Sequence, residues 1–107
     1  MNLMENLGYY NGKYDLIENM TVPMSDRVCW FGDGVYEATP TRNGVIYCLE
    51  EHVERFFSSA SKVYIDLPFT RDELKELLKD LVSKVDTGDT NGETFLYWQI
   101  TRGANIP

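Results

Sequence analysis

The stretch EEHVERFFSSASKVYIDLPFTRDELKELLKDLVSKV, residues 50–85, decides the fold, because its apolar residues recur every three to four positions. In its first half, one side of a helix collects the apolar residues Val53, Phe56, Phe57, Ala60 and either Val63 or Tyr64. A period near 3.6 is typical of an amphipathic helix that packs one face on a core. We therefore predict a helix over residues 50–64.

The second half predicts another helix, separated from the first by Ile65-Asp66-Leu67-Pro68. Thr70 followed by Glu73 fits a capping box, in which each side chain bonds the backbone of the other residue. The residues that follow give the clearest periodic pattern of the chain: Leu74, Leu77, Leu78, Leu81, Val82 and Val85. We expect both helices to pack on one core.

The segments on either side have the features of strands and tight turns. Residues 7–10 and 13–18 flank Asn11-Gly12, and residues 35–42 and 45–49 flank Asn43-Gly44. Asn-Gly supplies the positive φ angles that a two-residue hairpin turn requires. After a polar loop at 86–92, residues 93–102 are rich in β-branched and aromatic side chains and predict a further strand. This order predicts an α+β fold, a mostly antiparallel sheet packed with two helices.

Pro40 lies inside the predicted strand at 35–42. A proline has no N–H to donate to a sheet ladder. We therefore expect this strand to lie at a sheet edge or to bend near Pro40.

Size and charge narrow the class of protein. A chain of 107 residues, 43% of them apolar, suits one domain with its own core. Its 10 basic and 17 acidic residues give a net charge of −7, which disfavours nucleic acid and anionic membranes as partners. Without a visible signal or membrane-spanning segment, we expect a cytoplasmic protein that binds small molecules or other protein chains. Cys29 and Cys48 fit no metal or redox spacing, and we expect buried reduced thiols.

Residues 31–37, Phe31-Gly32-Asp33-Gly34-Val35-Tyr36-Glu37, contain a Gly-x-Gly that enters a predicted strand. A dinucleotide site places such glycines before a helix whose N-terminus holds pyrophosphate, so this is not a Rossmann fingerprint. Composition alone favours a tight turn at the glycines and a core aromatic at Tyr36.

His52 and Arg55 lie three residues apart on the first predicted helix and are therefore neighbours on its surface. Together they can present an imidazole and a guanidinium to one anionic ligand, and the planar fork of arginine suits phosphate. The alternative is a solvated helix face on which both residues pair locally with Glu50, Glu51 or Glu54.

Other chemistry is scarce in the sequence. A single histidine cannot supply a metal site with ordinary ligand counts, so we expect no metal. The chain has five lysines, and none looks desolvated enough to form a Schiff base: Lys13, Lys62, Lys75, Lys79 and Lys84.

Five motifs, taken in order, resemble the amino-terminal domain of the class IV (fold type IV) aminotransferases, which use pyridoxal 5'-phosphate (PLP). The motifs are Asp26-Arg27, residues 31–37, residues 51–56 (EHVERF), residues 65–70 (IDLPFT) and residues 99–103 (QITRG). The resemblance covers nearly the whole chain and is strongest to the D-amino-acid (D-alanine) aminotransferases. Branched-chain aminotransferases and aminodeoxychorismate lyases share much of the pattern, from which Pro40 departs.

The resemblance implies that residues 1–107 form the small amino-terminal domain of a homodimeric enzyme. PLP would lie between this domain and a larger carboxy-terminal domain that is absent from this chain. Arg55 would bind the cofactor phosphate, Tyr36 would hold the substrate carboxylate through its hydroxyl, and His52 would support the substrate site. The Schiff-base lysine and an Arg-x-His carboxylate trap are expected beyond Pro107. We therefore expect no catalytic residue in this chain, which on its own should be inactive and should not retain PLP.

The function implied for the full-length protein is transamination between an amino acid such as D-alanine and a 2-oxo acid. Two alternatives within the family are a branched-chain aminotransferase and an aminodeoxychorismate lyase. A third alternative is a stand-alone binding or dimerisation domain that retains the fold without catalysis.

Overall fold

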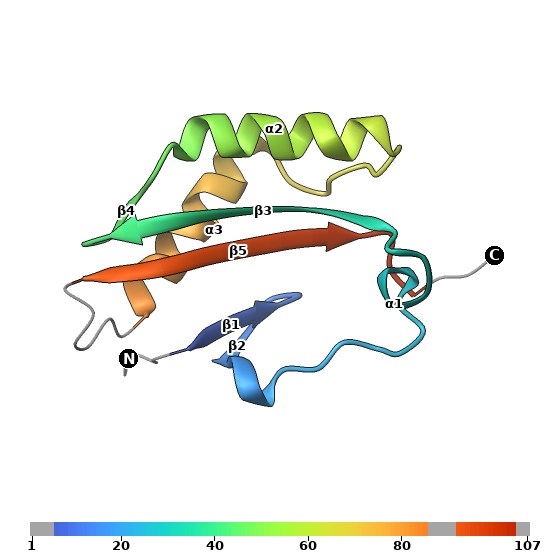
Figure 1. Ribbon diagram of the computed structural model, residues 1–107, viewed down its shortest axis with the longest axis horizontal. Coiled ribbons are helices and arrows are strands. Elements are labelled where there is room, and N and C mark those ends of the chain that lie inside the picture. The colour runs from blue at the N-terminus through green and yellow to red at the C-terminus, as the bar shows by residue number, and fades with distance from the viewer. Residues whose placement is uncertain (1–5, 86–91, 105–107) are drawn as a thin grey trace.

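The computed structural model describes residues 6–85 and 92–104 (Figure 1). Its elements in chain order are β1 (Leu7–Tyr10), β2 (Lys13–Leu16), η1 (Ile17–Asn19), α1 (Arg27–Phe31), β3 (Gly34–Arg42), β4 (Val45–Ile46), α2 (Leu49–Lys62), α3 (Arg71–Lys84) and β5 (Glu93–Thr101). All described strand pairs are antiparallel, and two long helices accompany them. The predicted α+β class is confirmed. Of the predicted loop at 86–92, only Gly92 lies among the described residues.

β3 is the central strand of a three-stranded sheet in the order β4-β3-β5. It pairs with β5 along its whole length, from Gly34 opposite Thr101 to Arg42 opposite Glu93. With β4 it pairs only at Thr41 and Arg42. Figure 1 shows α2 running along β3 on the side away from β5, and the two elements are in contact. Within the described residues, most of β3 thus pairs with a strand along one edge only, and α2 packs against it.

Both hairpin turns form at the predicted Asn-Gly pairs. Asn11 and Gly12 have φ angles of 48° and 91°, and Asn43 and Gly44 have 50° and 81°. Two consecutive positive φ angles match the twist of the flanking strands. β2 ends at Leu16, earlier than predicted, because the chain turns into the short 3-10 helix η1.

The core lies between the two long helices and one face of the three-stranded sheet. Its buried side chains are Ile46, Val53, Phe56, Leu74, Leu78, Val82 and Leu96. α3 begins with the predicted capping box, since Thr70 and Glu73 each accept a backbone N–H from the other. Both predicted helices are confirmed: the one expected over residues 50–64 spans Leu49–Lys62, and the second spans Arg71–Lys84.

The end of α2 differs from the expected apolar stripe. The helix stops at Lys62, and Val63 and Tyr64 are exposed instead of packed on the core. Tyr64 has a φ of 60°, and the N–H of Ile65 donates to the Ala60 carbonyl at 2.9 Å, which is a Schellman ending. The reversal brings Ile65 into the buried position that the periodicity assigned to Val63 or Tyr64.

β3 is the middle strand of its sheet, but β4 pairs only with Thr41 and Arg42, so Pro40 lies where one edge of β3 has no paired strand. The Pro40 carbonyl accepts the N–H of Tyr47 at 3.2 Å, just past the end of β4. Because the nitrogen and the carbonyl of one strand residue point to the same side, the Pro40 nitrogen, which carries no hydrogen, also faces Tyr47. The Tyr47 carbonyl, which that N–H would have bonded, accepts the Thr39 hydroxyl at 2.8 Å. A neighbouring side chain thus replaces the hydrogen bond that proline cannot make.

The expectation of buried thiols is wrong, because Cys29 and Cys48 are both exposed and free. Cys29 lies on α1, a five-residue surface helix that the sequence pattern does not predict. Cys48 precedes α2 with a φ of 51°, in a connection outside the core. Within the described residues, no helix is long and apolar enough to cross a membrane.

Candidate anion-binding site

Glu37 lies at the centre of a polar cluster between β3 and α2. Its Oε2 accepts Arg55 Nε at 2.7 Å, and its Oε1 accepts Arg55 Nη2 at 2.8 Å. His52 Nδ1 lies 2.6 Å from the same Oε1, so the tautomer with a proton on Nδ1 donates to it. The two predicted helix residues therefore converge on one carboxylate, which the sequence pattern does not single out.

Exposure differs sharply across this cluster. The side chain of Glu37 is 4% exposed and that of His52 is 16% exposed, whereas that of Arg55 is 67% exposed. The fork to Glu37 uses Nε and Nη2, and no hydrogen bond reaches Arg55 Nη1 from the described residues. An arginine has five N–H donors, so the outer edge of the guanidinium keeps donors for an anion.

The charges in the cluster stabilise one another. Hydrogen bonds from Arg55 hold the pKa of Glu37 below its ordinary value, although burial of the carboxylate acts in the opposite direction. The same carboxylate raises the pKa of Arg55 above its ordinary value. Glu37 is therefore ionised at neutral pH, and Glu37 and Arg55 form an ion pair.

The alternative of local pairing on the helix surface is wrong for His52 and Arg55. Glu50 instead contacts Lys75 of α3, and Glu54 contacts Arg71 of the same helix. The turn of α2 that carries His52 and Arg55 faces β3, where Glu37 is nearer than the helix's own exposed glutamates. A partner 15 or 18 residues away along the chain cannot be read from helical spacing.

Tyr36 projects from the other face of β3, because successive strand residues alternate. It is 64% exposed and stacks on Tyr97 of β5, with ring centroids 5.5 Å apart and planes 21° apart. The alternative of a core aromatic is therefore wrong for Tyr36. The structure brings His52 and Arg55 together and separates Tyr36 from them by the strand itself.

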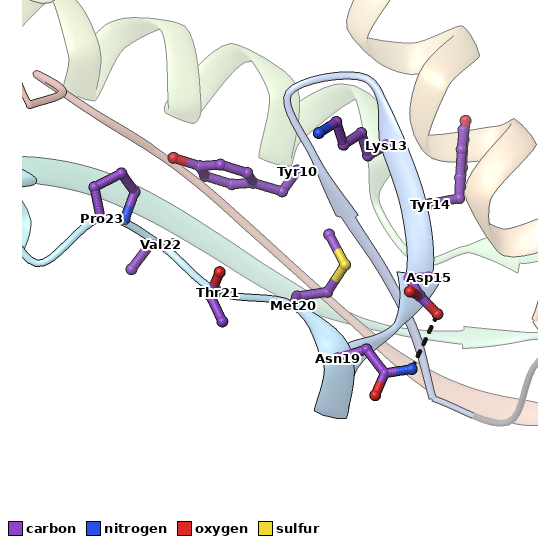
Figure 2. A pocket seen from close by; sticks show the side chains of 9 residues that line it. All are labelled: Tyr10, Lys13, Tyr14, Asp15, Asn19, Met20, Thr21, Val22 and Pro23. Carbon is purple, nitrogen blue, oxygen red and sulfur yellow. Dashed lines mark hydrogen bonds between the residues drawn. The ribbon is translucent and has the colours of Figure 1, made fainter.

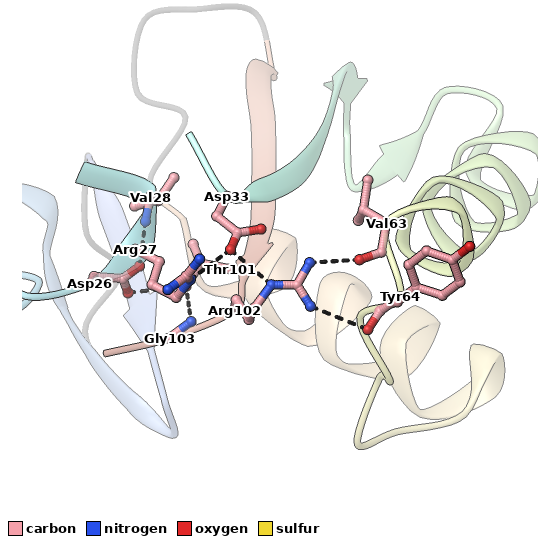
Figure 3. Close-up of polar contacts among 9 residues, drawn as sticks. All are labelled: Asp26, Arg27, Val28, Asp33, Val63, Tyr64, Thr101, Arg102 and Gly103. Atoms are coloured by element: carbon pink, nitrogen blue, oxygen red, sulfur yellow. Dashed lines mark hydrogen bonds and ion pairs between the residues drawn. The ribbon is translucent and has the colours of Figure 1, made fainter. Parts of the chain in front are cut away.

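A second cluster joins the start of β3 to the end of β5 (Figure 3). Asp33 Oδ2 accepts Arg27 Nε and Arg102 Nε, each at 2.8 Å. Arg102 also donates to the carbonyls of Val63 and Tyr64, at 2.6 and 3.3 Å. The bonds from Arg102 and then Arg27 lower the pKa of Asp33. This cluster fixes the turn before β3 against the end of α2.

Asp26 completes the second cluster from the α1 side. One of its oxygens caps α1 at the Val28 N–H, and the other accepts the Thr101 hydroxyl at 3.0 Å. The Arg27 N–H donates to the Gly103 carbonyl at 2.9 Å. The chain after β5 is thus attached to α1. The QITRG motif, through Thr101, Arg102 and Gly103, connects the end of β5 to α1 and to the turn before β3.

The lysines do not have the environment of a Schiff-base lysine. Lys75 is the most covered of those paired on the helices, and its bond to Glu50 raises its pKa, which favours the ammonium over the neutral amine. Lys84 pairs with Asp80 and Lys79 with Glu76, and Lys13 and Lys62 are exposed. The described residues also contain no group of three or more His, Cys, Asp or Glu that can hold a metal ion.

A hollow opens between the β1–β2 hairpin and the segment after η1 (Figure 2). Its lining residues are Tyr10, Lys13, Tyr14, Asp15, Asn19, Met20, Thr21, Val22 and Pro23. None of the three predicted site residues lines this hollow. It therefore adds nothing to the cluster at Glu37.

Fold and site together define a class of domain: a small antiparallel sheet, two helices on one face, and an exposed arginine held by a buried carboxylate. The sequence pattern of the family described as amino-transferase class IV matches residues 34–105. The match spans more than half of the chain, and the chain belongs to the class IV aminotransferases. The family predicted from the five motifs is confirmed.

Named relatives agree with this assignment. The chain is 39% identical over 92 residues to the D-alanine aminotransferase of Listeria monocytogenes, a match that covers 84% of this chain and 30% of the relative. It is 40% identical over 94 residues to that of Bacillus licheniformis, covering 88% of this chain and 32% of the relative. The chain thus spans about a third of the length of these curated relatives.

Solved structures share the fold. The branched-chain amino acid aminotransferase of Escherichia coli gives a TM-score of 0.77 at 19% identity, covering 97% of this chain and 36% of that chain. A fold IV transaminase from Curtobacterium pusillum gives a TM-score of 0.72 at 26% identity, covering 86% and 31%. The described domain therefore has the fold of one part of such enzymes.

Proposed function

We propose that the protein containing this chain is a PLP-dependent transaminase that moves an amino group between D-alanine, or a similar amino acid, and a 2-oxo acid. Membership of class IV supports the reaction type. The relatives at 39% and 40% identity support D-alanine as the substrate. The single observation that carries the cofactor assignment is the exposed Arg55 guanidinium, fixed on one edge by Glu37.

The donor set suits the phosphate of PLP. A guanidinium held on one edge offers its other edge to two oxygens of a phosphate monoester, and it stays charged at every physiological pH. When bound, PLP supplies an electron-poor ring that stabilises negative charge on the α carbon of the substrate. Arg55 would anchor the phosphate, and His52, held through Nδ1, would have a supporting role at the substrate site.

Tyr36 would serve the substrate end of the site. Its hydroxyl can donate to a carboxylate, and its ring is already held against Tyr97. Tyr36 and Arg55 are held by different contacts, Tyr36 by Tyr97 of β5 and Arg55 by Glu37 of β3. The two residues should therefore affect different binding constants.

The remaining parts of the reaction belong elsewhere in the protein. Because each described lysine is either exposed or paired with a carboxylate, the lysine that carries PLP and moves the proton is assigned to a carboxy-terminal domain. In this scheme residues 1–107 are the small amino-terminal domain of a homodimer, and they bind and orient ligands. The isolated chain would be inactive and would not retain PLP.

Replacing Arg55 tests the cofactor assignment. In the full-length protein, Arg55→Ala should weaken PLP binding by roughly 10- to 100-fold, the usual range for lost hydrogen bonds to a charged group. The measurement is an absorbance titration of the apoprotein with PLP. Arg71→Ala, which removes a surface arginine paired with Glu54, is the matched control and should bind PLP normally. Equal affinity in the Arg55 variant and the wild type would reject the assignment.

A substrate assay tests the reaction itself. The full-length protein with PLP should form pyruvate from D-alanine and 2-oxoglutarate, and the 107-residue chain should form none. A preference for L-leucine over D-alanine would replace the proposed substrate with a branched-chain amino acid. Absence of any amino transfer by the full-length protein would remove the proposed function.

A further inference from the structure

Glu37 is a charged side chain at a buried position of the sheet. It lies on the face of β3 that the helices cover, directly opposite Trp98 of β5. Removing a carboxylate from water costs free energy, and an apolar side chain in such a position is often as stable or more so. The burial of Glu37 therefore calls for an explanation beyond packing.

The geometry of the carboxylate supplies one. Both oxygens are used, and the three side-chain nitrogens around them come from only two residues, Arg55 and His52. His52 holds Oε1 from one side, while the two parallel bonds from Arg55 fix the plane of the guanidinium. Two parallel bonds define orientation as well as distance, which a single ion pair does not.

Arg55 would be poorly ordered without this fork. Its side chain is 67% exposed, and a long exposed arginine loses roughly 2 kcal/mol of rotamer entropy when it is ordered by a ligand. With Nε and Nη2 held by Glu37, that ordering has taken place before the ligand arrives. The Nη1 edge, which no described residue bonds, is then presented in one direction.

We infer that Glu37 is a positioning residue that orients the Arg55 guanidinium for the phosphate of PLP. The inference rests on the proposed function and adds a residue to it. Glu37 itself does not touch the phosphate, because its two oxygens accept hydrogen bonds from Arg55 and His52. In addition, the carboxylate and the phosphate are both negatively charged and repel each other. Its effect on cofactor binding should therefore pass entirely through Arg55.

The test compares PLP with pyridoxal, which lacks the phosphate, in the full-length protein. Glu37→Gln keeps the size of the side chain but turns one acceptor into a donor facing Arg55. The variant should bind PLP about tenfold more weakly and should bind pyridoxal as the wild type does. Glu54→Gln, the same change at an exposed glutamate of α2 that also pairs with an arginine, should leave both affinities unchanged.

A double variant separates positioning from general damage. If Glu37 acts through Arg55, the variant with both Glu37→Gln and Arg55→Ala should bind PLP as weakly as Arg55→Ala alone. Losses that add in the double variant, or an equal loss of pyridoxal affinity in Glu37→Gln, would overturn the inference. Should Glu37→Gln fail to fold, Glu37→Asp keeps the charge and withdraws the carboxylate from the fork, and it should show the same selective loss.

The outcomes also distinguish the inference from the function beneath it. Wild-type protein that binds PLP no better than pyridoxal would reject the phosphate site and the inference with it. A wild type that prefers PLP, an Arg55→Ala variant that loses the preference, and a Glu37→Gln variant that keeps it would reject only the role of Glu37.

Discussion

The two faces of β3 differ in a way that burial alone does not explain. On the face covered by the helices, Glu37, Thr39 and Thr41 are polar and buried. On the bare face, Tyr36 lies beside Tyr97, and both are more than half exposed. Antiparallel sheets with one covered face usually place apolar residues inward and polar residues outward. The comparison teaches that polar side chains on the covered face are used within the domain: Glu37 bonds Arg55 and His52, and Thr39 bonds the Tyr47 carbonyl.

The covered face should dominate stability, and replacing Phe56 gives the largest expected effect. Phe56 is 1% exposed and packs against Trp98, so Phe56→Ala should lower the free energy of unfolding by about 3–5 kcal/mol. Urea unfolding followed by tryptophan fluorescence measures the change. The matched control is Phe95→Ala on the bare face, where Phe95 is 68% exposed and the loss should stay below about 1 kcal/mol. Similar losses at the two positions would contradict the contrast between the faces.

The charge on the covered face should give stability a specific dependence on pH. Because Arg55 lowers the pKa of Glu37 in the folded chain, the Glu37–Arg55 ion pair makes its full contribution to stability above the ordinary pKa of glutamate. Its contribution is lost as the pH falls through the lowered pKa of the folded state. The difference in melting temperature between wild type and Glu37→Gln should therefore shrink as the pH falls below about 4.5. A difference that grows on acidification would show that Glu37 is not held as a carboxylate.

The bare face should matter least for stability and most for the substrate. Tyr36→Phe removes only an exposed hydroxyl, so the free energy of unfolding should change by less than about 0.5 kcal/mol. In the full-length protein the same change should raise the KM for the amino acid without altering PLP affinity. A weakened PLP affinity in this variant would show that Tyr36 and Arg55 do not bind separate parts of the ligand, the substrate carboxylate and the PLP phosphate, as proposed.

Local signals in the sequence are sufficient to predict the two long helices and the two hairpin turns. The capping box at Thr70 and the Asn-Gly pairs act within a few residues, and the period of α3 reports its buried face directly. The end of α2 is harder to predict, because a left-handed Tyr64 replaces the glycine that usually marks such an ending. The motif resemblance, which uses the order of distant segments, predicts the family correctly.

The polar contacts cannot be derived from spacing. Arg55 and His52 stand out as neighbours, but their partner Glu37 comes from another element, and only the packing of α2 on β3 brings them together. The same holds for Asp33, which receives Arg102 from the far end of the domain. For the two cysteines, the general tendency of this residue type to be buried is the only guide, and their surface positions at α1 and before α2 override it.

The hydroxyl of Thr39 that replaces the missing N–H of Pro40 also has a consequence for self-association of the chain. An exposed strand edge with free donors and acceptors can recruit another chain and begin aggregation. Just past the end of β4, the edge of β3 that faces Tyr47 has no N–H donor at Pro40. The Tyr47 carbonyl beside it is already bonded by the Thr39 hydroxyl. Extension of the sheet by another chain is thus disfavoured at this point.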